Sequence, residues 1–329
     1  MKISTFLIQY KMVILRYILM FASFWFLISF IDLSRFTQLL NMISGSTLFY
    51  AFTLALLRLW LLIERWRLLI PTNHRVSRWD YLRIILASGS INLFVPGILG
   101  SDIVRSVMVA RGNEKPNNNA FLSVYMDRII GLSSILLMGL VVSTIVTDFK
   151  YRIPVIILTV TMLSALWFLI WLSRHPSLHQ IIEKWALEGS NISRFISTKL
   201  NYAISILRDY NPTPSVILFA FGLSIPIHLL WFTMVWMVGH SIGAEVSLSV
   251  VSLVTIIVWI ATLLPLTIAG IGMRELGFVY LLNQYSLSDA QSILMGLFQS
   301  FVLLFFAILG IPFLWYYLWY KDSIKKESI

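Results

Sequence analysis

The chain has 329 residues, a length that would allow more than one soluble domain, but its composition excludes that class. Hydrophobic residues make up 58% and charged residues 12%, whereas soluble proteins average roughly 45–50% and 25%. So few polar side chains cannot cover a surface in water, and the composition therefore indicates an integral membrane protein. The same figures exclude a disordered, collagen-like or coiled-coil chain.

The formal net charge of +10 points to a membrane surface rather than to nucleic acid. The sequence carries no signature of an RNA-binding, zinc-finger or helix-turn-helix module, so we expect no nucleic-acid partner. Cationic loops are typical of the cytoplasmic side of membrane proteins, where they contact anionic lipid headgroups. The chain has no Cys, which excludes disulfides, thiolate metal sites and iron–sulfur clusters.

The first half of the chain alternates long apolar segments with one short, interrupted one. A spanning helix needs about 20 largely apolar residues. Three full spans are predicted at residues 13–31, 42–63 and 121–147. A basic loop is predicted at 64–83, and we expect Arg58 to extend its side chain to this interface. The segment at 84–111 is short and broken by Pro and Gly, so it is predicted to be a re-entrant hairpin.

The second half repeats this order. Three further spans are predicted at residues 153–173, 215–239 and 293–319. The polar stretch between the first two has apolar residues at helical spacing, which predicts an interfacial amphipathic helix at 178–210. Residues 246–282 again form an apolar run broken by Pro and Gly, and they are predicted to be a second re-entrant hairpin.

The predicted fold class is therefore an all-α integral membrane protein with six full spans and two re-entrant helical hairpins. Its two membrane repeats would cover residues 1–147 and 153–320. With both termini in the cytoplasm, most Lys and Arg side chains lie on the cytoplasmic side. The two hairpins then enter from opposite faces, and such an inverted repeat is a transporter architecture. The alternative is a chain of eight ordinary spans.

Charged residues inside the apolar segments are the most informative ones, because each costs several kcal/mol, of order 3, unless it is paired or hydrated. Glycines beside them allow tight turns, and a helix expected to begin near Ser101 would attract an anion at its N-terminus. We expect Arg105 and Arg274 to hold a phosphate, since a guanidinium group offers it two donors. The candidate substrate-binding residues are Asn92, Gly97, Gly100, Asp102, Arg105, Asp127, Arg128, Gly270, Gly272, Arg274 and Glu275.

The carboxylates leave two interpretations open. Asp102, Asp127 and Glu275 can pair with these arginines, Asp102 with Arg105 and Asp127 with Arg105 or Arg274, which makes a structural clamp. Alternatively, these carboxylates can bind a cationic headgroup, and the two roles are compatible with each other. We expect no catalytic residue, metal or cofactor, because the sequence has no P-loop, nucleophile elbow or paired-carboxylate pattern.

Three motifs resemble those of the lysylphosphatidylglycerol synthase transmembrane region, a flippase-like family. They are residues 92–105 (NLFVPGILGSDIVR), 123–132 (SVYMDRIIGL) and 264–275 (LPLTIAGIGMRE). Their order and spacing match over nearly the whole chain. Ser101 departs from the pattern, since many members have a second Gly there, but a small residue still permits the turn.

The resemblance implies a multi-pass helical protein of the cytoplasmic membrane that moves an amphipathic lipid between leaflets. Since the chain ends soon after its last predicted span, we expect a stand-alone member without the soluble synthase domain. Stand-alone members are linked to glycolipid or polysaccharide pathways, which implies a glycosyltransferase or lipid-modifying enzyme as a partner.

The leading hypothesis is a lipid flippase or transporter rather than an enzyme. Its cargo would be a phospholipid, an aminoacyl-lipid, a glycolipid or a polyprenyl-phosphate-linked sugar. The alternatives are an intramembrane enzyme acting on lipid-linked sugars, a scaffold for a glycosyltransferase, and a coupled ion transporter.

Overall fold

The structure is a computed structural model that describes residues 33–72, 75–93, 98–112, 118–175, 212–264 and 267–327, together with Ile18 and Trp25. The regular elements in these ranges are all helical, and the chain is an all-α protein, as its apolar segments predict. The α-helices are α2 (Leu33–Met42), α3 (Gly45–Leu69), α4 (Arg78–Ile91), α5 (Ile98–Gly112), α6 (Asn118–Ile145), α7 (Arg152–Arg174), α10 (Pro214–Ser241), α11 (Leu248–Thr262), α12 (Met273–Leu282) and α13 (Asp289–Glu327). Two short 3-10 helices, η2 (Ile268–Gly270) and η3 (Asn283–Tyr285), flank α12.

Four of the described helices, α3, α6, α10 and α13, are long and apolar enough to cross a membrane. They lie where the sequence predicts the second, third, fifth and sixth spans, and α7 lies at the fourth. The chain is therefore a multi-pass membrane protein. The predicted first span at 13–31, apart from Ile18 and Trp25, and the interfacial helix at 178–210 lie outside the described residues, and so does Gly97.

Local sequence explains where several helices begin. Ser44, Ser77 and Ser247 immediately precede α3, α4 and α11, and each side chain accepts the backbone N–H three residues on. α10 starts with Pro214, which lacks the N–H that a first helical turn leaves unpaired.

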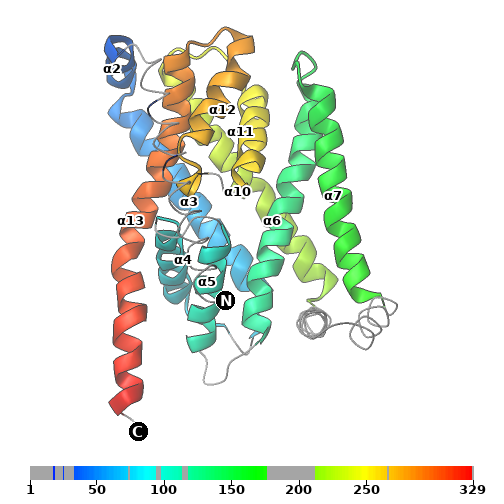
Figure 1. The fold of residues 1–329 in the computed structure, drawn as a ribbon, viewed down its shortest axis with the longest axis vertical. Helices are drawn as coiled ribbons and strands as arrows, with labels where there is room; N and C mark the ends of the chain where they lie inside the picture. Colours follow the sequence, from blue (N-terminus) through cyan, green and yellow to red (C-terminus); the bar gives the residue numbers. More distant parts are fainter. Residues whose placement is uncertain are drawn as a thin grey trace.

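Two pairs of shorter helices occupy opposite ends of the molecule (Figure 1). α4 and α5 lie at the end that also holds the C-terminal part of α13, whereas α11 and α12 lie at the end that holds α2 and the start of α13. In the first pair α4 ends at Ile91 and α5 begins at Ile98, and in the second α11 ends at Thr262 and α12 begins at Met273. The inverted repeat, the re-entrant character of the two pairs and their sidedness stay predictions.

α13 supports both broken pairs. Gly296 of α13 lies so close to α12 that a Cβ there would be 2.9 Å from the Cα atom of Glu275. About four turns further along α13, a Cβ at Gly310 would collide with the backbone carbonyl of Leu86 in α4. Ser90 of α4 donates its hydroxyl to the carbonyl of Ala307 at 2.6 Å. The glycines therefore allow one long helix to hold both halves of the fold at close range.

We expect Gly310→Ala to destabilise the protein, because the added methyl group meets a backbone carbonyl rather than a movable side chain. Overpacking of this kind costs about 1–3 kcal/mol. The matched control is Gly222→Ala in α10, where a Cβ would meet nothing within 4 Å. Thermal unfolding in one detergent should show a lower Tm for Gly310→Ala only. Equal Tm values for the two variants would contradict the close crossing of α4 and α13.

The helix boundaries differ from expectation at the predicted basic loop. α3 continues to Leu69 rather than ending at residue 63, and α4 begins at Arg78 rather than at 84. Residues expected in a loop are thus helical, among them the buried Arg65. The physical reason is the set of polar partners that Arg65 has inside the fold, described below.

Candidate functional site

Two adjoining cavities lie inside the helix bundle, and the larger one is lined by residues beside both helix breaks. The larger measures about 310 Å³ and is bounded by α3, α4, α13 and the break before α12. The smaller measures about 230 Å³ and is bounded chiefly by α3, α6, α10 and α11. Because Arg58, Arg128, Trp259 and Arg274 line both, the cavities form one site region.

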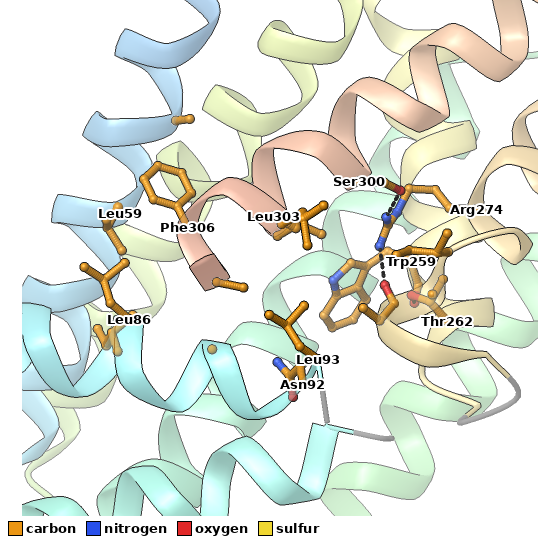
Figure 2. Close-up of a pocket in the computed structure, with 18 of the residues that line it drawn as sticks. Leu59, Leu86, Asn92, Leu93, Trp259, Thr262, Arg274, Ser300, Leu303 and Phe306 are labelled. Atoms are coloured by element: carbon orange, nitrogen blue, oxygen red, sulfur yellow. Dashed lines mark hydrogen bonds between the residues drawn. The ribbon is translucent and has the colours of Figure 1, made fainter. Parts of the chain in front are cut away.

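The larger cavity has a polar end and an apolar end (Figure 2). Arg274 and Ser300 lie at one side of it, and Leu59, Leu86 and Phe306 lie at the other. The wall residues Leu303 and Leu304 are each 37% exposed, so the cavity reaches the outer surface of the helix bundle beside α13. Such a cavity can accept a molecule that is polar at one end and apolar at the other.

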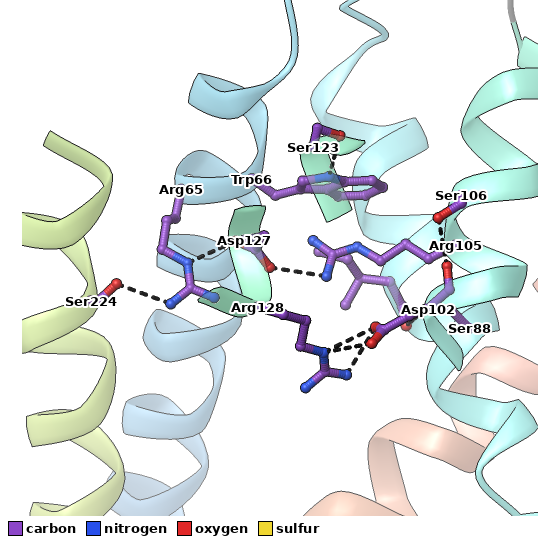
Figure 3. Close-up of polar contacts among 11 residues, drawn as sticks. Arg65, Trp66, Ser88, Asp102, Arg105, Ser106, Ser123, Asp127, Arg128 and Ser224 are labelled. Atoms are coloured by element: carbon purple, nitrogen blue, oxygen red, sulfur yellow. Dashed lines mark hydrogen bonds and ion pairs between the residues drawn. The ribbon is translucent and has the colours of Figure 1, made fainter. Parts of the chain in front are cut away.

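The first cluster of charges links α3, α5 and α6 (Figure 3). Asp127 accepts a hydrogen bond from Arg65 Nε on one carboxylate oxygen at 2.8 Å and from Arg105 Nη1 on the other at 3.1 Å. The side chains of Arg65 and Asp127 are only 6% and 4% exposed. One buried carboxylate therefore holds two buried guanidinium groups, and the cluster keeps an excess positive charge.

Neutral residues fix the two arginines in place. Arg65 also donates to Ser224 of α10 at 3.0 Å, and its guanidinium lies against Gly131, where a Cβ would be 3.1 Å away. The Arg105 guanidinium stacks over Trp66, 3.7 Å from the ring centroid, and the Trp66 indole donates to Ser123. The orientations are thus determined by packing as well as by charge.

Asp102 pairs with Arg128 and not, as expected, with Arg105. Arg128 donates from Nε to both carboxylate oxygens, at 3.0 and 2.8 Å, and from Nη2 to one of them at 2.9 Å. Arg105 lies three residues after Asp102 in the same helix, but the two do not pair, because the Arg105 side chain is bound to Asp127 instead. The Arg128 side chain is 41% exposed, so this pair lies at the accessible edge of the network.

The second cluster is built on α12 and α13. Arg274 donates to Ser300 Oγ at 2.5 Å and to the carbonyl of Ala269 at 3.1 Å. Ser300 in turn donates its hydroxyl to Glu275 at 2.6 Å. Glu275 is fully buried. Ser300 therefore bridges the cation and the carboxylate, and it ties the short helix α12 to the long helix α13.

The turn before α12 uses backbone conformations that favour glycine. Gly270 and Gly272 have φ values of 75° and 86°, and Ala269 between the same helices has a φ of 54°. The Gly272 N–H donates to the Glu275 carboxylate at 2.6 Å. The anion position at the N-terminus of α12 is therefore filled by the chain's own carboxylate rather than left free for a phosphate.

The structure brings most of the predicted site residues to this region. Asn92 ends α4 and lines the larger cavity, as Gly270 and Arg274 do. Asp127 and Arg105 line the smaller cavity, and Arg128 lines both. Asp102 and Glu275 line neither cavity but are hydrogen-bonded to Arg128 and Ser300, which do, and Gly272 is hydrogen-bonded to Glu275. Gly100 lies in the first turn of α5, which begins at Ile98, three residues before the expected start.

Two arginines of the site were not expected there. Arg65 was predicted to lie in the basic loop at 64–83, and Arg58 was predicted to extend to the interface. Instead, the Arg58 guanidinium lies over the Trp231 ring at 4.6 Å from its centroid and lines both cavities. The partners of both arginines lie far along the chain, so the only local signal is a cation inside an apolar run.

Several buried polar atoms around the cavities lack a hydrogen-bond partner in the described structure. In proteins such atoms are nearly always satisfied, by protein, water or ligand. Those that belong to lining residues are Arg58 Nε, Asn92 Oδ1, Arg105 Nε, Thr255 Oγ1 and Thr267 Oγ1. The cavity walls therefore offer both donors and acceptors to a polar occupant.

Comparison with known protein families identifies one match. The model described as "Lysylphosphatidylglycerol synthase TM region" matches residues 13–319, most of the chain and both broken helix pairs. No curated protein and no solved structure matches the chain.

Proposed function

Since the chain belongs to the lysylphosphatidylglycerol synthase transmembrane-region family, we propose that it is a lipid flippase or transporter. It would move a phosphate-bearing lipid between the leaflets of the cytoplasmic membrane, with both termini in the cytoplasm. The cargo classes that fit are phospholipids, aminoacyl-lipids, glycolipids and polyprenyl-phosphate-linked sugars.

One observation carries this proposal: an arginine-lined cavity with an apolar end is lined by residues beside the breaks of both helix pairs. Broken helices that meet at a binding site are a recurring feature of transporters, where the site is exposed to each side in turn. Arg274 and Arg105 would take part in holding the phosphate, and the leucine and phenylalanine wall would accept the start of the acyl chains.

The polar clusters would also supply the rigid parts of such a transporter. Arg65, Asp127 and Arg105 join α3, α5 and α6, whereas Arg274, Ser300 and Glu275 join α12 to α13. Among the described residues, no hydrogen bond or ion pair joins one cluster to the other. The two clusters would therefore move as separate units while the headgroup lies between them.

The test is lipid retention by protein purified in a mild detergent and analysed by native mass spectrometry. We expect the wild-type protein to retain a defined phosphate-bearing lipid, and Arg105→Gln/Arg274→Gln to retain about tenfold less, because two charged donors are lost. The control is Arg35→Gln in α2, which lines neither cavity.

Equal retention by the wild type and the double variant, both monodisperse, would contradict the assignment of these arginines. Covalent conversion of the lipid by the purified protein would instead favour an intramembrane enzyme. A glycosyltransferase partner is a further proposal, which co-purification from the native membrane would test.

A further inference from the structure

The charges around the two cavities do not balance. Five arginines line them, on four helices, and the described structure offers these arginines three carboxylates. Asp127 forms ion pairs with Arg65 and Arg105, and Asp102 forms one with Arg128. Glu275 is linked to Arg274 through the hydroxyl group of Ser300. The arginines are Arg58, Arg65, Arg105, Arg128 and Arg274. The described walls therefore carry an excess of two positive charges.

Arg58 is the lining arginine that has no carboxylate partner among the described residues. Its Nε atom is buried and makes no hydrogen bond. A guanidinium group has five N–H donors and cannot give up its charge, so its burial costs free energy until an anion or water satisfies it. Since Arg58 lines both cavities, an anion beside it would be in reach of the whole site region.

The side chain of Arg58 is held in place by a contact that leaves its N–H groups free to donate hydrogen bonds. Its guanidinium lies over the Trp231 ring, and this contact does not use the N–H groups as a carboxylate would. The Trp231 indole donates to Gln299 Oε1 at 3.0 Å, and Gln299 Nε2 donates to the Met295 carbonyl at 3.3 Å. Residues of α10 and α13 thus fix a cation of α3 beside an open space.

Resting on the proposed function, we propose that Arg58 is the principal ligand of the headgroup phosphate and that the site selects an anionic headgroup. A headgroup with a net positive charge, such as an aminoacylated one, would add to an uncompensated excess of positive charge in a region of low polarity. A phosphate monoester, diphosphate or phosphodiester with an uncharged substituent would reduce that excess instead. The neutral groups Thr255 and Gln299 of the smaller cavity suit an uncharged polar substituent.

The experiment is a competition for wild-type protein between lipids with the same acyl chains, read by native mass spectrometry. The probes are phosphatidylglycerol, phosphatidylethanolamine and lysylphosphatidylglycerol, which are anionic, zwitterionic and cationic. We expect retention to fall in that order. Arg58→Gln should retain phosphatidylglycerol about tenfold less, the size of one charge-assisted hydrogen bond. Arg58→Lys should be intermediate, because it keeps the charge but loses the planar fork.

The matched control is Arg83→Gln, which removes one positive charge from a side chain outside both cavities that is 49% exposed. It should behave as the wild type, which separates the site from general attraction to anionic lipid. Glycerol 3-phosphate distinguishes the two sources of phosphate: if it displaces the lipid at an equal concentration, the acyl chains add nothing and the site reads a free phosphate rather than a lipid headgroup.

The outcomes separate this assignment from the function on which it rests. Retention of phosphatidylglycerol that is unchanged in Arg58→Gln, or a wild-type preference for lysylphosphatidylglycerol, would overturn the assignment and leave lipid transport standing. A wild-type protein that retains none of the three lipids would overturn both for phospholipid and aminoacyl-phospholipid cargo.

Discussion

Asp127→Asn should be the most destabilising single substitution in the site. It leaves Arg65 and Arg105 buried without a carboxylate, and removing one partner of a buried ion pair costs about 3–5 kcal/mol. Arg65→Gln should cost less, because Asp127 then keeps one cation, Arg105. The double variant Arg65→Gln/Asp127→Asn should be more stable than Asp127→Asn alone, since one uncompensated charge is gone.

The free energy of unfolding in mixed micelles measures this order. Asp102→Asn should have a smaller effect than Asp127→Asn, because its partner Arg128 is 41% exposed and can be hydrated. The control is Asp80→Asn, whose ion pair with Arg83 at 3.6 Å is on the surface, where such pairs contribute little. If Asp127→Asn were as stable as Asp80→Asn, the three-residue cluster would not hold the fold together.

Glu275→Gln should have the second largest effect, and it should act on the turn before α12. The carboxylate accepts the Gly272 N–H and the Ser300 hydroxyl, and an amide can accept only through its single oxygen. We expect a loss of about 2–3 kcal/mol, the range of hydrogen bonds to a charged group. Ser300→Ala should cost less, since it removes the bridge but keeps both charges.

The matched control for this prediction is Glu245→Gln, the same substitution on an exposed residue between α10 and α11. Hydrogen exchange of the α12 backbone would localise the effect, with faster exchange at residues 272–276 expected in Glu275→Gln only. Uniform loosening of all helices, or none, would contradict the role of Glu275 as the N-terminal cap of α12.

The sequence predicts the fold better than it predicts the contacts. Long apolar runs and the Pro and Gly breaks are local properties, so the described spans and both interruptions could be placed from them. The end of α3 could not, because average hydropathy treats Arg65 as a solvated charge. Its partner Asp127 lies 62 residues away, and in the fold the pair is buried.

The same reasoning explains which site residues were found. Asp102, Arg105 and Arg274 stand out because they follow the breaks, but the choice of partner depends on three-dimensional packing. Arg128 reaches Asp102 from another helix, and Glu275 turns back to its own helix N-terminus. Arg58 was expected at the interface because it lies near the end of its predicted span. Its aromatic partner, Trp231, belongs to α10, and no feature of the sequence near Arg58 indicates that contact.

Movement of lipid between leaflets decides whether the cavity serves transport. Purified protein would be reconstituted in liposomes that contain a fluorescent phosphatidylglycerol, and the fraction of lipid accessible to a membrane-impermeant quencher would be followed over time. We predict faster exchange between leaflets than in protein-free liposomes of the same composition, and a rate close to the protein-free one for Arg105→Gln/Arg274→Gln. An equal rate with and without wild-type protein, tested with and without an ion gradient, would exclude the proposed function for this lipid class.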